Sequence, residues 1–402
     1  MAKARSTKEH KLSNFLNIIK KKKVKFYLIK KSHILLLDNN YANLKFKNYK
    51  TSLWNANEVL FFYFLKALFL YFTNNKEKNK LNFIYKKIVF KSYGAKIAID
   101  HNLSGRAIEI KKICPEIKVI IYEVGFTEPV NKLIPRIKNL YISSYKICDY
   151  YLVFSKRELN IYKKLGLNNK TIIAGSARNN GRPFKNQKKN YDIVYISQYL
   201  NSGSNFEAID KKNVFVHLEL ALKDHNKIER FIIRTIHEYC EKYKKKYTIA
   251  VRGLRQERVG RDVGQEINFI EKIINKRFKI IREHGWNLTN QAKLVINNCS
   301  TLGFELRSRG ANVLFLPLQT PITKKYGIDK SKILKEKKAV NICTSFNKEK
   351  IFKKINYLLK LHKKYKTSSH FKKQINIVRY DNKNSILKGL VKKLLLAKNQ
   401  ND

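Results

Sequence analysis

The sequence predicts an α/β protein with two domains, each built on an open parallel sheet. The chain has 402 residues, more than the roughly 250–300 that one hydrophobic core usually serves. Short apolar runs without polar alternation, typical of buried parallel strands, alternate with helical patterns along most of the chain. This alternation stops once, at a polar segment, and then begins again.

The first domain is predicted over residues 23–180, after a basic tail at residues 1–22. Buried strands are expected at four apolar runs: Val24–Ile29, Lys96–Asp100, Lys118–Val124 and Tyr150–Phe154. Helical patterns are found at Leu103–Ile113 and at Ser155–Gly166, the second of which has a Ser N-cap and a terminal Gly.

Residues 181–191, GRPFKNQKKNY, form the predicted linker because they are polar and contain Gly and Pro. The second domain is predicted over residues 192–385, with a C-terminal helix and tail at residues 386–402. Its strands are expected at Asp192–Ser197, Tyr247–Gly253, Lys293–Asn297 and Asn312–Pro317. Its helices are expected at Asn226–Lys245, Gly264–Ile274, Thr301–Gly310 and Lys348–Tyr365.

The formal net charge is +55, from 85 Lys and Arg against 30 Asp and Glu, and such charge attracts polyanions. Lysine is spread along the whole chain with abundant Asn, Ile, Tyr and Phe, as a compositional bias would produce. Nucleic-acid binders instead concentrate charge on one face and favour Arg. Nucleic acid is therefore not an expected partner, and peripheral contact with an anionic membrane is the better functional interpretation of the charge.

Cysteine usage and the N-terminus indicate a cytoplasmic protein, with a peripheral place on the inner face of the cytoplasmic membrane as the membrane-bound alternative. The five cysteines lie far apart without a CxxC pair, which argues against a zinc site or a disulfide framework. No apolar run of a signal peptide follows the first residues. The apolar stretch Val59–Phe72 contains Lys66 and is shorter than the ~20 residues that span a bilayer. A buried or interfacial helix is therefore expected, and a monotopic membrane contact is the alternative.

A donor-binding turn is predicted after the strand at Lys293–Asn297, because ligands of open parallel sheets bind beyond the carboxyl ends of the strands. Backbone N–H groups at the start of a helix attract phosphate, and a carboxylate one turn later can accept hydrogen bonds from a ribose. The alternative is plain capping of the helix by Ser or Thr with the Glu. The residues in question are Ser300, Thr301, Leu302, Gly303 and Glu305.

Two further strand ends of the second domain are polar. Guanidinium groups after the strand at Tyr247–Gly253 would lie where the charge of a diphosphate sits. The strand at Asp192–Ser197 ends in a Ser and a Gln. The predicted donor-binding residues at these ends are Arg252, Gly253 and Arg255, and Ser197 and Gln198.

The first domain supplies the candidates for acid–base catalysis. Asp100 and His101 end one predicted strand, and Glu123 ends the next. An imidazole or a carboxylate there can take the proton of an acceptor hydroxyl. The alternative is that Asp100 or Asn102 caps the helix that follows.

Missing motifs exclude several classes of enzyme. The sequence has no GxxxxGK[ST] loop, and no GxGxxG follows the first strand, which argues against a P-loop ATPase and a dinucleotide oxidoreductase. It also has no DxD motif and no His/Cys cluster, so neither a metal nor another cofactor is expected. A departing diphosphate would then be stabilised by the helix dipole and by arginine.

Several segments, in this order, resemble a bacterial family of surface-carbohydrate biosynthesis proteins associated with O-antigen-type polysaccharides and similar to GT-B glycosyltransferases. They are YYLVFSKRELNIYKKLGLNNKTIIAGSARNN, DIVYISQY, HEYCEKYKKKYTIAVRG, INNCSTLGFELRSRGANVLFLP and YDNKNSILKGLVKKL. The resemblance covers residues 95–395.

The resemblance implies two Rossmann-like domains facing across a cleft, with C-terminal helices and a nucleotide-sugar held mainly by the second domain. Ser300, Thr301, Gly303 and Glu305 match the family's Ser-Thr-Leu-Gly-x-Glu element, and Arg309 matches the Arg-Gly that closes its helix. Family members tend to have Gln-Asn-Gly where this chain reads Glu-Val-Gly at residues 123–125, so the acceptor side departs from the family.

The leading functional hypothesis is a metal-independent glycosyltransferase of surface polysaccharide biosynthesis. It would move a sugar from a nucleotide-sugar donor to a lipid-linked or glycan acceptor. A nucleotide-sugar 2-epimerase shares the architecture and is the first alternative. A non-enzymatic polyanion-binding protein is the second.

Overall fold

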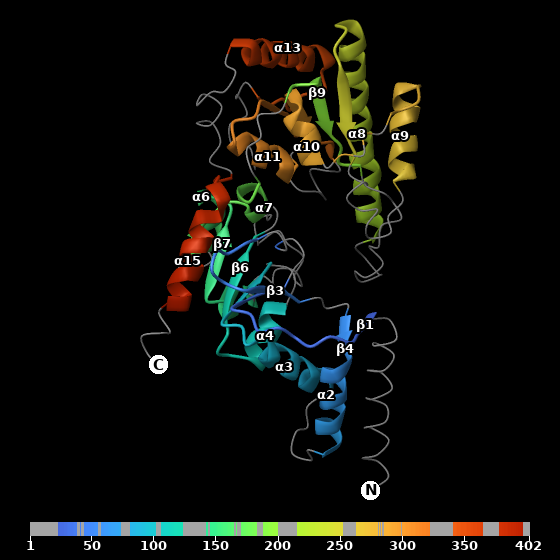
Figure 1. The fold of residues 1–402 in the computed structure, drawn as a ribbon. Helices are drawn as coiled ribbons and strands as arrows, with labels where there is room; N and C mark the ends of the chain where they lie inside the picture. The colour runs from blue at the N-terminus through green and yellow to red at the C-terminus, as the bar shows by residue number, and fades with distance from the viewer. Residues whose placement is uncertain are drawn as a thin grey trace. The chain divides into compact units, whose positions relative to one another are not determined.

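The structure is a computed structural model, which describes residues 23–37, 41, 44–54, 58–73, 81–101, 106–123, 142–143, 145–164, 166, 170–182, 188–199, 215–251, 263–279, 281, 283, 285–298, 300–321, 341–364 and 378–396. The chain forms two compact units. Met1–Arg182 and Arg379–Asp402 make up the first, and Pro183–Val378 the second. Each is a parallel sheet covered by helices, so the predicted α/β class is confirmed (Figure 1). That the two units face each other across a cleft stays a prediction.

The first unit contains a sheet of six parallel strands in the order β3-β2-β5-β6-β7-β8. The central strands are almost completely buried because both faces of the sheet are covered, which explains their continuous apolar sequences. The strands are β2 (Ile34–Leu36), β3 (Thr51–Leu53), β5 (Ile97–Asp100), β6 (Lys118–Tyr122), β7 (Tyr150–Val153) and β8 (Thr171–Ile173).

Helices pack on both faces of this sheet. One face carries α3 (Leu81–Tyr93), α4 (Arg106–Ile113) and α6 (Lys156–Lys163), and α2 (Phe61–Thr73) packs against α3. The other face receives α15 (Ser385–Leu396), which buries Leu387, Val391 and Leu395. The predicted N-cap of α6 is confirmed, since Ser155 Oγ accepts a hydrogen bond from Arg157 N–H at 3.1 Å.

The prediction of a buried strand at Val24–Ile29 is wrong. Only β1 (Lys23–Lys25) forms there, and it pairs with β4 (Glu58–Leu60) outside the main sheet. Phe26 and Leu28 are 67% and 68% exposed. β2 takes the expected place in the sheet, because it can pair with β3 on one side and β5 on the other.

The last part of the chain returns to the first unit at Arg379, before the predicted domain end at residue 385. Hydrogen bonds to a short helix, α7 (Ala177–Asn180), fix this return. Asn180 Oδ1 accepts a hydrogen bond from Asp381 N–H at 2.9 Å, and Asn384 Nδ2 donates to Ala177 O at 3.0 Å. Both segments belong to the quoted motifs AGSARNN and YDNKNS, whose pairing could not be read from either alone.

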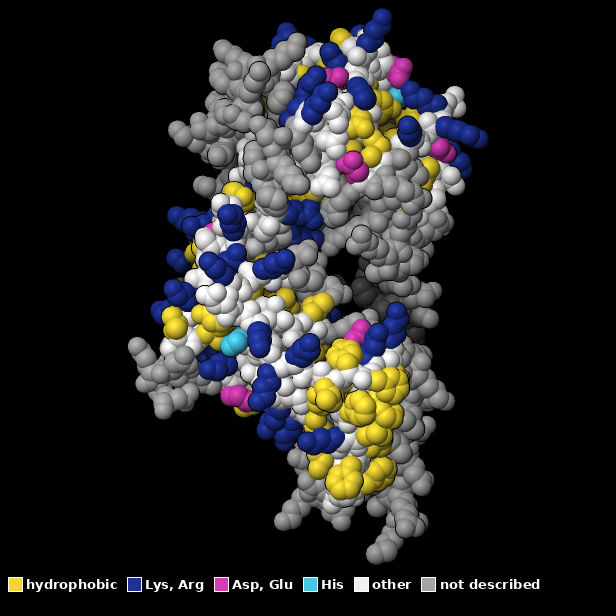
Figure 2. Space-filling view, viewed as in Figure 1, with side chains coloured by type: hydrophobic (Ala, Val, Ile, Leu, Met, Phe, Trp, Pro, Cys, Tyr) yellow, Lys and Arg dark blue, Asp and Glu magenta, His cyan; other side chains and the backbone are white. Residues whose placement is uncertain are grey.

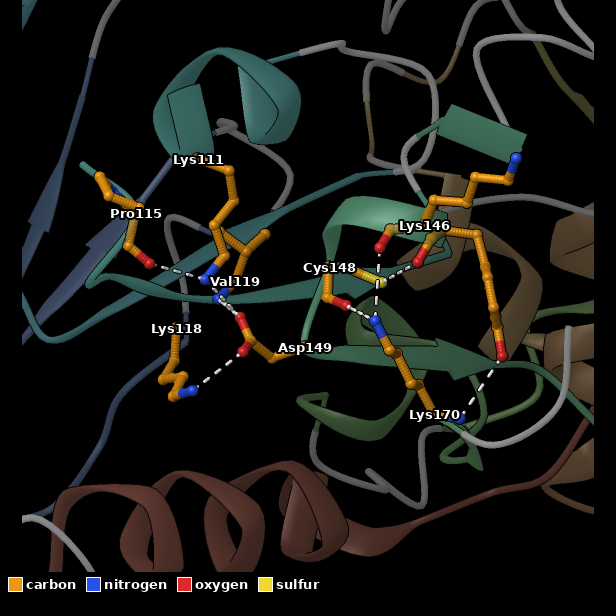
Figure 3. A network of polar contacts seen from close by, with 9 residues as sticks. Lys111, Pro115, Lys118, Val119, Lys146, Cys148, Asp149 and Lys170 are labelled. Carbon is orange, nitrogen blue, oxygen red and sulfur yellow. Dashed lines mark hydrogen bonds and ion pairs between the residues drawn. The ribbon is translucent and has the colours of Figure 1, made fainter. Parts of the chain in front are cut away.

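A charged network closes the opposite, amino-terminal edge of the first sheet (Figure 3). Asp149 accepts a hydrogen bond from Val119 N–H at 2.8 Å and forms ion pairs with Lys111 at 2.9 Å and Lys118 at 3.1 Å. Burial raises the pKa of Asp149, but the Val119 hydrogen bond and the two lysines outweigh it and hold the pKa below its usual value. Because this network lies away from the carboxyl ends of the strands, its role is structural.

The second unit contains four parallel strands in the order β10-β9-β11-β12, as predicted for a parallel sheet. The strands are β9 (Tyr191–Ile196), β10 (Tyr247–Ala250), β11 (Ala292–Asn297) and β12 (Val313–Phe315). A parallel bridge from Phe315 to Ile342 extends the sheet. The helices are α8 (Phe215–Lys242), α9 (Gly264–Ile274), α10 (Gly285–Asn290), α11 (Thr301–Ser308) and α13 (Lys348–Lys364).

Candidate functional site

The topology of the second unit marks one place on its sheet for a ligand. The first strand of the unit, β9, has β10 on one side and β11 on the other, so the direction of strand order reverses between β9 and β11. In open α/β sheets, ligands bind beyond the carboxyl ends of the strands at this switch point. Asn297 pairs with Ile196 in the register, which brings the residues after both strands to the same edge.

The start of α11 follows β11 directly at this edge. Ser300 has the extended backbone of an N-cap residue, φ −67° and ψ 141°, but its side chain makes no capping hydrogen bond. Capping by Ser300, one part of the alternative interpretation of this turn, is therefore not seen. Ser300 N–H is held by Asn297 Oδ1 at 2.8 Å, while the next N–H groups belong to the first helical turn, which has no acceptor within the helix. Their partial positive charge favours an anion.

Gly303 lies against a side chain of the protein itself. A Cβ at this position would be 2.4 Å from Asn297 Nδ2 and 2.6 Å from Asn297 Cγ and Oδ1. Asn297 is fully buried, so its amide has little room to move away. The glycine is thus required by the packing of the turn, and the approach of a donor is not needed to explain it.

The remaining predicted residues of α11 lie deeper in the unit. Glu305 is 2% exposed. Arg309 lies at the C-terminal end of the helix, where its guanidinium stacks over Trp286 with 5.2 Å between Cζ and the ring centroid. Arg309 therefore lies about 12 Å along the helix from its start, given eight helical residues at ~1.5 Å each. Arg307, which no sequence pattern had indicated, is 1% exposed, and its burial lowers its pKa to about 10.

The end of β9 lies beside the start of α11 and is held by a buried carboxylate of α8 that no sequence pattern had indicated. Glu229 of α8 is fully buried, and its Oε2 accepts hydrogen bonds from Gln198 N–H at 3.0 Å and Tyr195 Oη at 2.6 Å. His225 Nε2 lies 2.9 Å from Gln198 O. Ser197 Oγ accepts a hydrogen bond from Tyr199 N–H at 3.2 Å. Glu229 lies on the inward face of α8 among apolar residues. A carboxylate within the apolar stripe of a helix is the sequence feature that could have predicted it.

After β10, the structure describes the chain only as far as Val251. The predicted donor-binding residues Arg252, Gly253 and Arg255 lie outside the described residues.

The first unit has its own switch point between β2 and β5, since the strand order reverses there. Asp100 ends β5 at this place and is fully buried, with Oδ2 accepting a hydrogen bond from Ala107 N–H at 3.0 Å. This bond holds the first turn of α4, as the capping alternative predicted. His101 follows at the edge and is half-buried. Of the two residues, His101 is the more accessible to a substrate.

Glu123 follows β6 and is also fully buried. Its carboxylate accepts hydrogen bonds from Tyr162 Oη at 3.2 Å and from Phe154 N–H at 3.4 Å. Tyr162 in turn lies 2.9 Å, oxygen to oxygen, from Tyr151 Oη. These bonds tie Glu123 to the next strand and to α6.

No group of three or more His, Cys, Asp or Glu residues suited to hold a metal ion occurs among the described residues.

Two solved structures of similar fold are UDP-GlcNAc 2-epimerases. The enzyme from Neisseria meningitidis, bound to UDP-GlcNAc, matches with a TM-score of 0.53 and 11% identity over 90% of this chain and 99% of that chain. The enzyme from Methanocaldococcus jannaschii matches with a TM-score of 0.52 and 12% identity over the same shares. At such identities the likeness establishes the fold alone, a GT-B-like pair of Rossmann-like domains. No curated protein matches the sequence.

The profile of one protein family, described as "putative O-antigen biosynthesis protein", matches residues 130–395. The match contains the end of the first sheet, the whole described part of the second and the C-terminal return, and it bears out the resemblance seen in the sequence. Because it covers well over half of the 402 residues, the chain belongs to this O-antigen biosynthesis family.

Proposed function

We propose that the protein is a metal-independent glycosyltransferase of O-antigen-type polysaccharide biosynthesis, which uses a nucleotide-sugar donor and a lipid-linked or glycan acceptor at the inner face of the cytoplasmic membrane. The observation that carries the proposal is the start of α11. It lies at the switch point of the second sheet, follows β11 directly and has a Ser300 side chain that caps no helical N–H group.

In the proposed reaction the oxygen of the acceptor hydroxyl forms a bond to the anomeric carbon of the sugar. The bond between that carbon and the diphosphate oxygen breaks, and the diphosphate takes the electron pair. The first N–H groups of α11 and the Ser300 hydroxyl stabilise this charge, with Arg252 and Arg255 as further cationic groups. His101 accepts the hydroxyl proton. The neighbouring Asp100 accepts a hydrogen bond from Ala107 N–H and so joins the end of β5 to the first turn of α4.

Product analysis tests the proposal. The protein is incubated with a panel of nucleotide-sugars, with and without a lipid-linked glycan acceptor. Free nucleoside diphosphate that appears only with acceptor supports transfer. The variant Ser300→Ala should lose at least about tenfold in rate, since hydrogen bonds to charged groups contribute about 1.5–3 kcal/mol. Ser308→Ala is the matched control, because Ser308 lies at the other end of α11 and donates to Glu305 O at 2.7 Å. Absence of transfer with every donor contradicts the proposal.

The second candidate is a nucleotide-sugar 2-epimerase, favoured by the fold shared with the two epimerases. The same incubation distinguishes it, because an epimerase yields an altered sugar on the intact nucleotide-sugar without acceptor. If the protein is a glycosyltransferase, His101→Ala should abolish sugar transfer. His33→Ala, at an exposed histidine of the same unit, is the control.

A further inference from the structure

The helix α2 carries apolar side chains on two faces. Its inner face packs on the core through Ala67 and Tyr71, which are 0% and 9% exposed. Its outer face presents side chains at spacings of three and four residues, which places them on one side of the helix. These are Phe62, Leu65, Phe69 and Phe72, between 46% and 67% exposed. A surface helix ordinarily turns polar residues outward, so this second apolar face indicates a further contact.

A neighbouring segment extends this face. The ring centroids of Phe26 and Phe61 are 5.0 Å apart, and Ile29 N–H donates to Tyr63 Oη at 2.9 Å. These contacts fix the exposed Phe26 and Leu28 beside the start of α2. Figure 2 shows the apolar side chains gathered over α2 as one continuous yellow area. We call Phe26, Leu28, Phe62, Leu65, Phe69 and Phe72 the α2 patch.

Basic side chains accompany the α2 patch. Lys23, Lys30 and Lys66 are exposed within the same stretch of chain. Glu58 is the one carboxylate that the structure describes from Lys23 to Tyr93. Figure 2 shows dark blue side chains along the edges of the yellow area. An apolar centre with a cationic border is complementary to an anionic lipid surface, whose headgroups attract lysine while the interface takes up aromatic and aliphatic side chains.

We propose that the α2 patch binds the surface of an anionic lipid bilayer, with α2 lying in the plane of the interface. The helix has 13 residues and is about 20 Å long at ~1.5 Å per residue, too short to cross the bilayer. Within the described ranges, no helix has the length and apolar character that a membrane crossing needs. A second copy of the chain is a poorer occupant, because the lysines of two facing patches would repel each other. This binding does not use the donor site; it deepens the proposed function, on which the membrane location rests, and vesicle binding is measured separately from sugar transfer.

Vesicle flotation of the full chain tests the proposal. Vesicles of phosphatidylcholine alone are compared with vesicles containing about one third phosphatidylglycerol, at about 0.1 M salt and at about 0.5 M salt, where exposed charges are more strongly screened. The native protein is expected to float only with the anionic vesicles and to bind several-fold less at the higher salt. Failure to bind anionic vesicles overturns the proposal without any variant.

Variants locate the contact. Phe62→Ser/Phe69→Ser should lower the partition coefficient at least about tenfold, because two large apolar side chains no longer leave water. Lys66→Glu should lower it several-fold. The matched controls Tyr357→Ser and Lys360→Glu alter exposed residues of α13 in the second unit and should leave binding unchanged. Equal binding by the double variant, with its circular dichroism preserved, overturns the proposal. So does a native dimer that the double variant converts to monomer.

Discussion

Replacing Gly303 by alanine tests how the start of α11 is built. The added Cβ would lie 2.4 Å from Asn297 Nδ2, far inside normal non-bonded contact. Asn297 must therefore rotate, although it is fully buried on β11. Rotation breaks the 2.8 Å hydrogen bond from Ser300 N–H to Asn297 Oδ1, which positions the turn.

The expected cost follows from three contributions. Overpacking a buried site costs about 1–3 kcal/mol, and a lost hydrogen bond about 0.5–1.5 kcal/mol. Alanine regains about 1 kcal/mol of helix propensity over glycine. Gly303→Ala should thus lower the free energy of unfolding by about 0.5–3.5 kcal/mol.

Urea denaturation of the full chain measures this effect, with Gly389→Ala in α15 as the control. A Cβ at Gly389 meets no atom within 4 Å, so that variant should be neutral or slightly stabilised. Asn297→Ala removes the obstructing amide, and adding Gly303→Ala to it should cost nothing further, so the coupling equals the whole cost of Gly303→Ala in the native chain. If Gly303→Ala and Gly389→Ala have the same free energy of unfolding, Gly303 does not lie in close contact with Asn297.

Three other substitutions test the first unit, each by urea denaturation. Asp149→Asn should destabilise by about 1–2 kcal/mol at neutral pH. Because the pKa of Asp149 is lowered in the folded state, the difference should be full above pH ~4 and disappear as the pH falls through the folded pKa; a constant difference down to pH ~2 would contradict this. Asn180→Ala should cost about 2–4 kcal/mol, since its buried amide makes three hydrogen bonds, one of them to Asp381; a cost below 1 kcal/mol would show that the C-terminal return does not depend on it. Ser155→Ala should cost about 0.5–2 kcal/mol by uncapping α6 at Arg157 N–H, and an unchanged midpoint would count against the cap.

The second unit was the easier to predict from the sequence. Its strands lie within two residues of the expected starts because both faces of the sheet are covered, so each strand is a continuous apolar run. In the first unit β3 and β8 are partly exposed, so their sequences lack a strong pattern. β2 is a continuous buried apolar run, but at three residues it is shorter than the run at Val24–Ile29. The apolar run at Val24–Ile29 has the composition of a buried strand. In the structure most of its apolar side chains are exposed to solvent, so composition alone gave the wrong prediction.

At the candidate site, the local sequence pattern predicted the turn between β11 and α11. It could not predict which side chains contact each other there. The order strand, Ser-Thr, Gly and helix is readable from residues 293–308 alone. That Asn297 lies on Gly303, and that Glu229 receives Gln198 N–H, depends on side chains brought together by the fold. Asp100 shows the same limit: its sequence position allowed both a base and a cap, and only the fold shows the hydrogen bond from Ala107 N–H that the capping alternative predicts.

Binding of nucleoside diphosphates to Thr301→Pro is the most direct test of the account. Thr301 is the first residue of α11, where proline is tolerated, and Ser300 already has the extended backbone that a residue before proline adopts. The substitution therefore removes one N–H donor and leaves the helix in place. Isothermal titration with a panel of nucleoside diphosphates should show binding to the native chain and an affinity at least about tenfold lower for the variant. Unchanged affinity, or no binding to the native chain, would contradict the claim that the start of α11 holds the diphosphate.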